Sequence, residues 1–397
     1  MLTNVKRLHE LMAQAELDAV VATSPENVTY MSGFWAMSQW VRRGPQAYIL
    51  WPAPSRGESC LIANSSALDL VADQKPWVQN VRRYEHFVVD RAPDAILNDV
   101  DQRQAALYEL PDDGDPLNAL CMAIHENALD RGRIAVDERG LLPGYFDALQ
   151  GRLPACTLVH GFELLRRCRS LKTKEEIVRL RRAAEIAEHS IAAALRVARA
   201  GASEIDLARA FHEQTIREGA FPVLGCIGFG SRSAMVNVQP SDRELESNDV
   251  IRFDVGGRYQ HYRADIARIA VRGKPSKKLT TYYHALHMGV RCAYDVVRPG
   301  AAASDIFLAV VNAVRSNGLP HYQRTHVGHG IGIDGYDVPA LSPSSKDIIE
   351  EGMVLCVETP YYELGLWGLQ VEDMLVVQRN GVESLMSTDG CLLTVTE

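Results

Sequence analysis

Four acidic residues of the 397-residue sequence lie inside apolar runs that read as β-strands: Asp254, Asp265, Glu358 and Glu372. Aspartate and glutamate are depleted in strands, and an unpaired buried carboxylate costs several kcal/mol. The fold must therefore supply something that compensates these charges. This requirement constrains the chain more than its composition does, because 47% apolar and 23% charged residues are ordinary for a globular protein.

The spacing of the acidic residues predicts two hairpins. A hairpin centred between residues 259 and 260 places Asp254 opposite Asp265, and a second hairpin places Glu358 opposite Glu372. Directly opposed residues have Cβ atoms about 4.5 to 5.5 Å apart, so two facing carboxylate pairs repel each other unless cations lie between them. Oxygen-rich sites with one imidazole suit Mn, Fe, Co or Zn, and bridging carboxylates favour two ions.

A glycine-rich segment, Thr325–Gly332, supplies the imidazole. It contains two histidines among glycines, which let the backbone approach a site closely. His329, which has glycine on both sides, is the predicted metal ligand. His326 is predicted to support the site or to face the substrate.

Charge and cysteine usage exclude several classes of protein. The formal net charge of −8, without a long basic run, argues against nucleic acid as a partner. No stretch approaches the roughly 20 apolar residues of a membrane span, and the first residues lack the apolar core of a signal peptide. The eight cysteines form no CxxC pair, which is typical of reduced thiols. We therefore expect a cytoplasmic protein without a membrane partner.

The chain is expected to form two domains, 1–160 and 161–397. Residues 1–160 alternate helix-like and strand-like runs, as in an α/β domain. The boundary lies in a basic, aperiodic segment, 161–172. Immediately after it, Thr173 with Glu176 three residues later predicts a capping box at the start of a long helix.

The second domain carries a weak internal repeat. Gly201–Leu207 resembles Gly300–Ile306, and at the same offset Gly219–Pro222 resembles Gly318–Pro320. The period is too long for a solenoid, so it predicts a duplicated helix–helix–strand unit. Two similar halves that face each other leave a cleft between them.

The order Asp, Asp, His, Glu, Glu, in settings such as Phe253–Gly256 and Gly328–Gly332, resembles the pita-bread metallopeptidases. That family includes aminopeptidase P, prolidase, methionine aminopeptidase and the metal-free creatinase. The match covers about residues 165 to 390, and Asn27–Phe34 is similar to the amino-terminal domain of the creatinase and prolidase branch. The resemblance implies an α/β N-terminal domain followed by an α+β pita-bread domain with pseudo-twofold duplication. It also implies a homodimer with two divalent ions, Mn, Co or Zn, in the second domain.

The resemblance also implies a role for each acidic residue. Asp254 and Asp265 would hold one metal, and His329 would hold the other with help from Asp265. Glu358 and Glu372 would bind or bridge the ions. The implied reaction is that of an Xaa-Pro dipeptidase or aminopeptidase, in which an activated water attacks the scissile carbonyl. In the family, the residue that corresponds to Glu358 also shuttles a proton.

Three positions depart from the pattern of an Xaa-Pro peptidase. Tyr336 and Asn237 each stand where those enzymes carry a histidine, and Gln370 stands where aminopeptidase P and prolidase carry arginine. Because these positions handle the substrate, we expect an atypical substrate: a small amide, a modified dipeptide or another compound with a C–N bond. Tyr336 is expected to donate a hydrogen bond to an oxyanion, and Asn237 to bond a substrate amide.

Three other functions fit the same residues. A metal-free enzyme of the creatinase kind would use histidine and glutamate directly on a C–N bond. A metal-dependent lyase could use the same scaffold. A non-catalytic binding module is disfavoured, because such modules lose metal ligands and this chain keeps all five.

Overall fold

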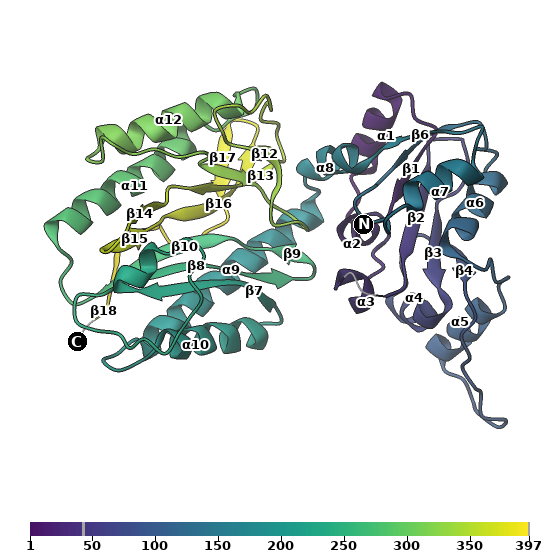
Figure 1. Ribbon diagram of the computed structural model, residues 1–397, viewed down its shortest axis with the longest axis horizontal. Coiled ribbons are helices and arrows are strands. Elements are labelled where there is room, and N and C mark those ends of the chain that lie inside the picture. Colours follow the sequence, from purple (N-terminus) through teal and green to yellow (C-terminus); the bar gives the residue numbers. More distant parts are fainter. Residues whose placement is uncertain (42–43, 396–397) are drawn as a thin grey trace. The chain divides into compact units, whose positions relative to one another are not determined.

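The computed structural model describes residues 1–41 and 44–395 and forms two compact units, Met1–Arg169 and Ser170–Glu397 (Figure 1). The division between the two units falls inside the segment 161–172, but this segment is largely helical and not aperiodic as expected. Helix α8 (Phe162–Ser170) occupies it and buries Leu165 and Cys168, which lie three residues apart and therefore share one helical face.

The first unit contains a mixed six-stranded sheet with the order β4-β3-β2-β1-β5-β6 in the part of the chain that the structure describes. Its helices and strands before α8 are α1 (Val5–Gln14), β1 (Ala19–Ala22), α2 (Pro25–Ser32), α3 (Met37–Trp40), β2 (Ala47–Pro52), β3 (Cys60–Asn64), η1 (Ser65–Ala67), α4 (Leu68–Gln74), β4 (Asn80–Tyr84), α5 (Asp99–Tyr108), α6 (Pro116–Glu126), β5 (Arg133–Val136), α7 (Tyr145–Arg152) and β6 (Thr157–His160). The predicted α/β class of this unit is confirmed.

The second unit contains a larger sheet whose main path has the order β12-β11-β13-β16-β10-β8-β7. Its helices are α9 (Lys174–Val197), α10 (Glu204–Arg217), η2 (Gly230–Ala234), α11 (Lys277–Val296) and α12 (Ala303–Ser316). Its strands are β7 (Phe221–Phe229), β8 (Val250–Tyr259), β9 (Tyr262–Arg263), β10 (Ile266–Arg272), β11 (Gly328–Gly330), β12 (Asp337–Ala340), β13 (Val354–Glu358), β14 (Tyr361–Glu363), β15 (Trp367–Leu369), β16 (Glu372–Gln378), β17 (Gly381–Ser384) and β18 (Leu393–Val395).

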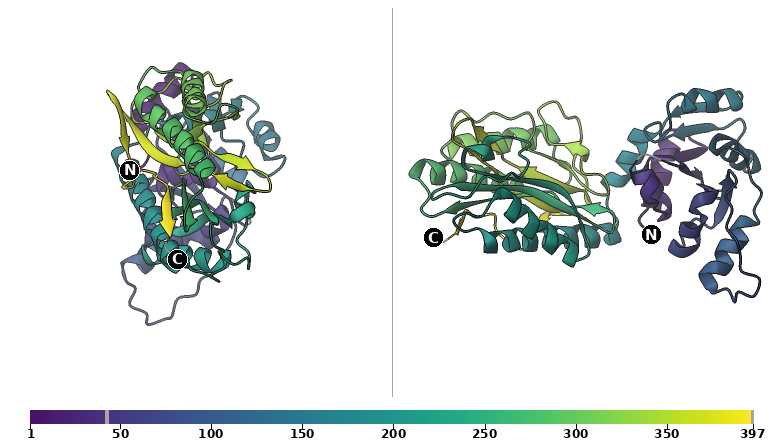
Figure 2. Two further views of the ribbon diagram at one scale, coloured as in Figure 1. Left: turned by 90° about the vertical axis from the view of Figure 1, so that its left-hand side faces the viewer. Right: turned by 60° about the horizontal axis from the view of Figure 1, so that its bottom comes forward.

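The predicted duplication is visible in the second unit. A pair of helices precedes a strand twice, as α9–α10–β7 and as α11–α12–β11. An isolated backbone bridge holds the start of the second helix in each half, Ser203 to Glu244 and Ala302 to Ile348. The strands lie between the two helix pairs (Figures 1 and 2). The predicted capping box at Thr173 and Glu176 is also present and begins α9.

The hairpin that carries the two glutamates has the predicted register. Strands β14 and β15 pair Tyr361 with Leu369, so the turn is centred on Gly365, and Glu358 lies directly opposite Glu372. Gly365 has a positive φ of 80°, a conformation that glycine adopts without the cost that other residues incur.

The turn of the hairpin that carries the two aspartates lies one residue later than predicted, which shifts the strand pairing by two residues. Asp254 pairs with Ala267 and not with Asp265, because the turn is formed by Gln260 and His261. Both turn residues have positive φ, 44° and 77°, as in the two-residue turns that match the twist of a hairpin. Asp265 lies between β9 and β10, two residues from Ala267. The strand period of two therefore leaves it on the side of the sheet that carries Asp254.

Among residues 1–41 and 44–395, no helix has the length and apolar character that a bilayer span requires.

Candidate metal centre

The sheet of the second unit lines up the acidic residues in one row. Asp254 pairs with Ala267, Ala267 with Glu372, and Glu372 with Glu358, across β8, β10, β16 and β13. Paired residues of neighbouring strands project to the same side of a sheet, so these side chains share one face. His329 pairs with Cys356 on the next pair of strands, β11 and β13, and joins this face because Cys356 lies two residues before Glu358.

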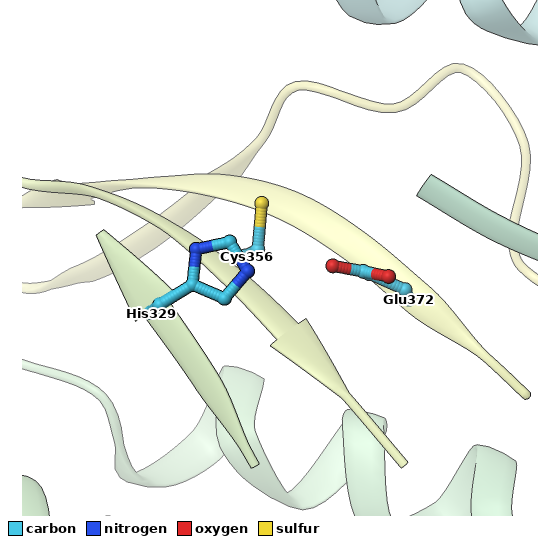
Figure 3. A group of neighbouring side chains, drawn as sticks. All are labelled: His329, Cys356 and Glu372. Carbon is cyan, nitrogen blue, oxygen red and sulfur yellow. The ribbon is translucent and has the colours of Figure 1, made fainter. Parts of the chain in front are cut away.

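Two groups of side chains on this face are close enough to hold a metal ion. Asp254, Asp265 and Glu372 form the first group, and His329, Cys356 and Glu372 form the second. Within each group, one ligand atom from each residue lies within 4.8 Å of the others. Figure 3 shows the carboxylate of Glu372 across from the imidazole of His329 and the thiol of Cys356. Glu372 belongs to both groups, as a bridging ligand would.

His329 offers a nitrogen that fits a metal ion. Its Nδ1 lies 3.0 Å from the carbonyl oxygen of Gly330, to which an Nδ1–H would donate and so leave the lone pair on Nε2. That Nε2 is buried and has no hydrogen-bond partner among residues 1–41 and 44–395, and Asp265 Oδ2 lies 3.8 Å away. Burial lowers the pKa of His329, which keeps the ring in the neutral form that binds metals. An orphaned imidazole nitrogen beside carboxylates is the donor set that the implied divalent ions require.

The acidic residues of the row are difficult to ionise without a cation. Burial, together with the charge of Glu358, raises the pKa of Asp254 to about 6 although the charge of Arg252 lowers it. Burial raises the pKa of Asp265 and of Glu372 well above the ordinary range, and the neighbouring carboxylates add to this. A divalent ion would reverse these shifts, because it is the largest local charge in such a site.

Arginines neutralise this cluster only in part. Among the described residues, neither Asp265 nor Glu372 has an arginine within ion-pair distance, and Arg252 lies 3.4 Å from Asp254. Arg268, which follows Ala267, projects to the other face of the sheet and pairs with Asp373 at 2.8 Å. The residues present therefore fit a metal centre better than they fit a structural ion-pair network.

Glu358 has a different partner from the other acidic residues. His326 Nε2 lies 2.9 Å from Glu358 Oε1. Burial raises the pKa of Glu358, but the hydrogen bond and charge of His326, with the charges of His329 and Arg324, outweigh it, and the pKa lies below its ordinary value. Within the described residues Glu358 belongs to neither three-residue group. The side chain of His326 is 34% exposed, so this pair forms the solvent-facing side of the cluster.

Tyr336 lies at the rim of the same cluster. Its ring stacks on His329, with centroids 4.0 Å apart and an interplanar angle of 25°. Burial and the charges of the four acidic residues raise its pKa, so the hydroxyl stays protonated and can donate a hydrogen bond. The residue is 62% exposed, which leaves one side of it open to solvent.

The other two predicted substrate residues have contrasting positions. Gln370 is buried, and both ends of its amide have protein partners: Oε1 accepts from Arg252 at 3.0 Å, and Nε2 donates to Glu372 at 3.3 Å. Asn237 is exposed and follows η2 in a turn. Substrate roles for both residues stay predictions.

Sequence reasoning missed two residues of this face. Cys356 lies two positions before Glu358, and Arg252 lies two positions before Asp254. Because side chains alternate along a strand, the period of two around each predicted ligand was the signal that could have found them.

Comparisons with known proteins agree with this architecture. Residues 178–379 match the model of metallopeptidase family M24, and residues 4–171 match the creatinase/prolidase N-terminal domain. The chain belongs to metallopeptidase family M24, and the predicted resemblance to the pita-bread enzymes of the creatinase, aminopeptidase P and prolidase branch is confirmed.

Individual relatives are similar at moderate identity. The Xaa-Pro dipeptidase of Pyrococcus furiosus is 29% identical over 235 residues, which are 58% of this chain and 67% of the relative. An uncharacterized peptidase of Staphylococcus aureus (strain USA300) is 30% identical over 226 residues, 56% of this chain and 64% of the relative. The match thus spans less than two thirds of the staphylococcal protein's length.

Solved structures share the fold over almost the whole chain. The X-Pro aminopeptidase of Thermotoga maritima superposes with a TM-score of 0.78 at 22% identity and covers 98% of this chain and 99% of its own. The Xaa-Pro dipeptidase of Bacillus anthracis gives a TM-score of 0.79 at 20% identity and covers 98% of both chains. These likenesses establish the two-domain pita-bread architecture.

Proposed function

We propose that this protein is a dinuclear metallohydrolase that cleaves an amide or peptide C–N bond, with a substrate choice that differs from ordinary Xaa-Pro dipeptides. The observation that carries the proposal is the cluster of Asp254, Asp265 and Glu372 beside the unpartnered Nε2 of His329. Three of the four acidic side chains on this face are buried. Arg252 contacts Asp254, but among the described residues neither Asp265 nor Glu372 has an arginine within ion-pair distance, so the cluster requires cations.

The chain offers ligands for two ions. Asp254 and Asp265 would hold one, His329 would hold the other with help from Asp265, and Glu358 and Glu372 would bind or bridge. When bound, the ions would lower the pKa of a water molecule and stabilise the negative charge that develops on the scissile carbonyl.

The protein's own side chains would handle the protons. Glu358, whose pKa is lowered, is ionised at neutral pH and can accept a proton from an attacking water. His326 lies 2.9 Å away and holds that carboxylate in place. The hydroxyl of Tyr336 can donate a hydrogen bond to the developing oxyanion. His326 and Tyr336 are partly exposed and stand at the edge of the cluster, where a substrate would enter.

The choice of ion depends on Cys356. Its thiol lies with His329 and Glu372 in one candidate group. Sulfur is a donor that Zn²⁺ and Co²⁺ accept more readily than Mn²⁺ does. The group therefore favours Zn or Co at the position of His329, while the all-oxygen group of Asp254, Asp265 and Glu372 suits Mn as well.

Metal analysis and a substrate panel test the proposal. Protein purified without chelator should contain close to two ions per chain, and dipeptides, N-acyl amino acids and small amides should be screened with Mn²⁺, Co²⁺ and Zn²⁺. Efficient hydrolysis of Ala-Pro or Leu-Pro would contradict the atypical substrate choice. Turnover without metal would favour a creatinase-like reaction, and an elimination product would favour a lyase.

The variant Glu358→Gln separates catalysis from binding. It keeps the shape of the side chain but removes the proton acceptor, so we expect turnover to fall by about 100-fold or more while the protein still folds. Unchanged turnover in this variant would exclude the role of Glu358. A dimeric state, measured by light scattering, and a cytoplasmic location are further parts of the proposal.

A further inference from the structure

Arg252 is a buried arginine beside the candidate metal centre, and none of the steps above uses it. It lies on β8 two residues before Asp254, so both side chains project from the same face of the strand. Its side chain has no solvent exposure. A buried guanidinium is costly unless hydrogen bonds satisfy it, so its contacts indicate what it does.

One nitrogen of Arg252 connects two proposed metal ligands. Its Nη1 lies 3.4 Å from Asp254 Oδ2 and donates to Gln370 Oε1 at 3.0 Å. Because the amide oxygen faces the guanidinium, the amide Nε2 faces Glu372 and donates to its Oε2 at 3.3 Å. If the amide were reversed, its oxygen would face the carboxylate and its NH₂ would face the cation. Arg252 therefore selects the orientation that gives Glu372 a hydrogen-bond donor.

The other terminal nitrogen of Arg252 holds a loop. Its Nη2 donates to the backbone oxygens of Met235 at 2.7 Å and Val236 at 2.9 Å. These residues directly precede Asn237, which is exposed. One rigid, planar group thus contacts both the acid cluster and the loop that carries a predicted substrate residue.

We propose that Arg252 is a positioning residue of the metal centre: it orients Asp254 directly and Glu372 through Gln370, and it fixes the loop before Asn237. The inference rests on the proposed function, because it assumes that the acid cluster binds ions. Arg252 and Gln370 are in contact at 3.0 Å, so we infer that the site uses one cationic and one amide side chain at this pair of positions. On this inference, the cation can be at residue 252 with the amide at residue 370, or the reverse.

An exchange of the two side chains tests this inference. Arg252→Gln leaves two facing amides and should weaken the binding of Mn²⁺ or Co²⁺ by about 10- to 100-fold, the usual effect of removing a group that supports metal ligands. Gln370→Arg places two guanidinium groups together and should weaken it as well. The double variant R252Q/Q370R should restore ion affinity to most of the wild-type value. The KM of the double variant for substrate should still differ from the wild-type value, because the backbone oxygens of Met235 and Val236 lose their donor.

Calorimetric titration of chelator-treated protein measures the affinity, and the visible absorption of the Co²⁺ form reports the ligand geometry independently of activity. Arg272→Gln is the matched control. It removes another buried arginine of the same sheet, one that donates to Ser247 at 3.4 Å, and it should leave ion affinity unchanged. Arg252→Lys keeps the positive charge but loses the planar guanidinium with its several donors. Its ion affinity should therefore lie between those of the wild type and Arg252→Gln.

The outcomes separate the two proposals. If the wild-type protein binds no ions, the proposed function fails. If the wild type binds ions and Arg252→Gln binds them equally well, only the inference about Arg252 fails. If Arg252→Gln does not fold, the exchange still decides: a folded R252Q/Q370R protein with weak ion binding would overturn the inference, and one with restored binding would support it.

Discussion

The two faces of the sheet in the second unit both carry buried acidic residues, but the charge of these residues is compensated by protein groups on one face only. Glu372 and Asp373 are neighbours on β16 and project to opposite sides. Asp373 pairs with Arg268 at 2.8 Å and accepts a hydrogen bond from Tyr294 at 3.0 Å. The carboxylate of Glu372 lies among other carboxylates and accepts a hydrogen bond from Gln370 at 3.3 Å.

A second acid on the Arg268 side shows the same contrast. Glu188 accepts hydrogen bonds from the backbone and hydroxyl groups of Ser387 and Thr388. Although burial raises the pKa of Glu188, these hydrogen bonds outweigh it and leave the pKa below its ordinary value. The pKa of Glu372 is instead raised well above the ordinary range by burial. Burial alone therefore does not mark a functional acid; burial without compensation does.

The largest expected effect is on the free energy of unfolding, when Asp373 and Glu372 are neutralised in separate variants. Asp373→Asn should destabilise the protein by about 3–5 kcal/mol, because it removes the closest partner of the buried Arg268. Glu372→Gln should instead raise the stability of the metal-free protein at neutral pH, because it removes repulsion from the acid cluster. It should also reduce the stabilisation that added metal confers on the wild type.

Denaturant unfolding with chelator and with Mn²⁺ measures both effects. Wild-type protein under the same two conditions is the control. Equal losses of stability in the two variants, with chelator present, would show that the two faces do not differ in how their acidic residues are compensated.

The sequence predicted the acid row well because its signals are local. Alternation along strands placed the acidic residues, and Gly365 set the register that pairs Glu358 with Glu372. The strand partner of Asp254 was missed by two residues, because the turn lies one residue later, at Gln260 and His261, and requires positive φ at residues that are not glycine. Propensity at single positions does not report such a turn.

The contacts of Arg252 were beyond sequence reasoning for a different reason. Arg252 and Gln370 are 118 positions apart, and their contact depends on how β8, β10 and β16 align. The same limit applies to the two faces of β16, since the sequence does not show that Arg268 pairs with Asp373 and leaves Glu372 uncompensated.

The pH dependence of stability gives a second, intermediate test. Asp254 has an ordinary pKa of 3.8 that is raised to about 6 in the folded metal-free protein. Between these values the folded protein holds more protons than the unfolded chain, so stability falls as pH rises. Asp265 and Glu372, whose pKa values are raised further, extend this loss toward neutral pH. Added metal should restore more stability at higher pH, because fewer protons compete for the carboxylates.

Thermal unfolding from about pH 5 to 8, with chelator and with Mn²⁺, measures this dependence. The Asp254→Asn variant should show a weaker loss between pH 5 and about 6, since it removes the group that titrates there. A metal-free stability that rises steadily over this range would contradict the assignment of the raised pKa values.

Two tyrosines provide the smallest and most selective test, because each stands beside one of the contrasting clusters. Tyr294 donates to Asp373 on the compensated face, so Tyr294→Phe should cost about 1 kcal/mol of stability and leave turnover unchanged.

Tyr336 stacks on His329 at the rim of the uncompensated face. Tyr336→Phe keeps the stacked ring, so it should preserve stability and ion affinity and lower kcat by about tenfold, equivalent to about 1.4 kcal/mol of transition-state stabilisation. If Tyr336→Phe changed ion affinity but not kcat, its hydroxyl would support the metal centre and would not act on the substrate.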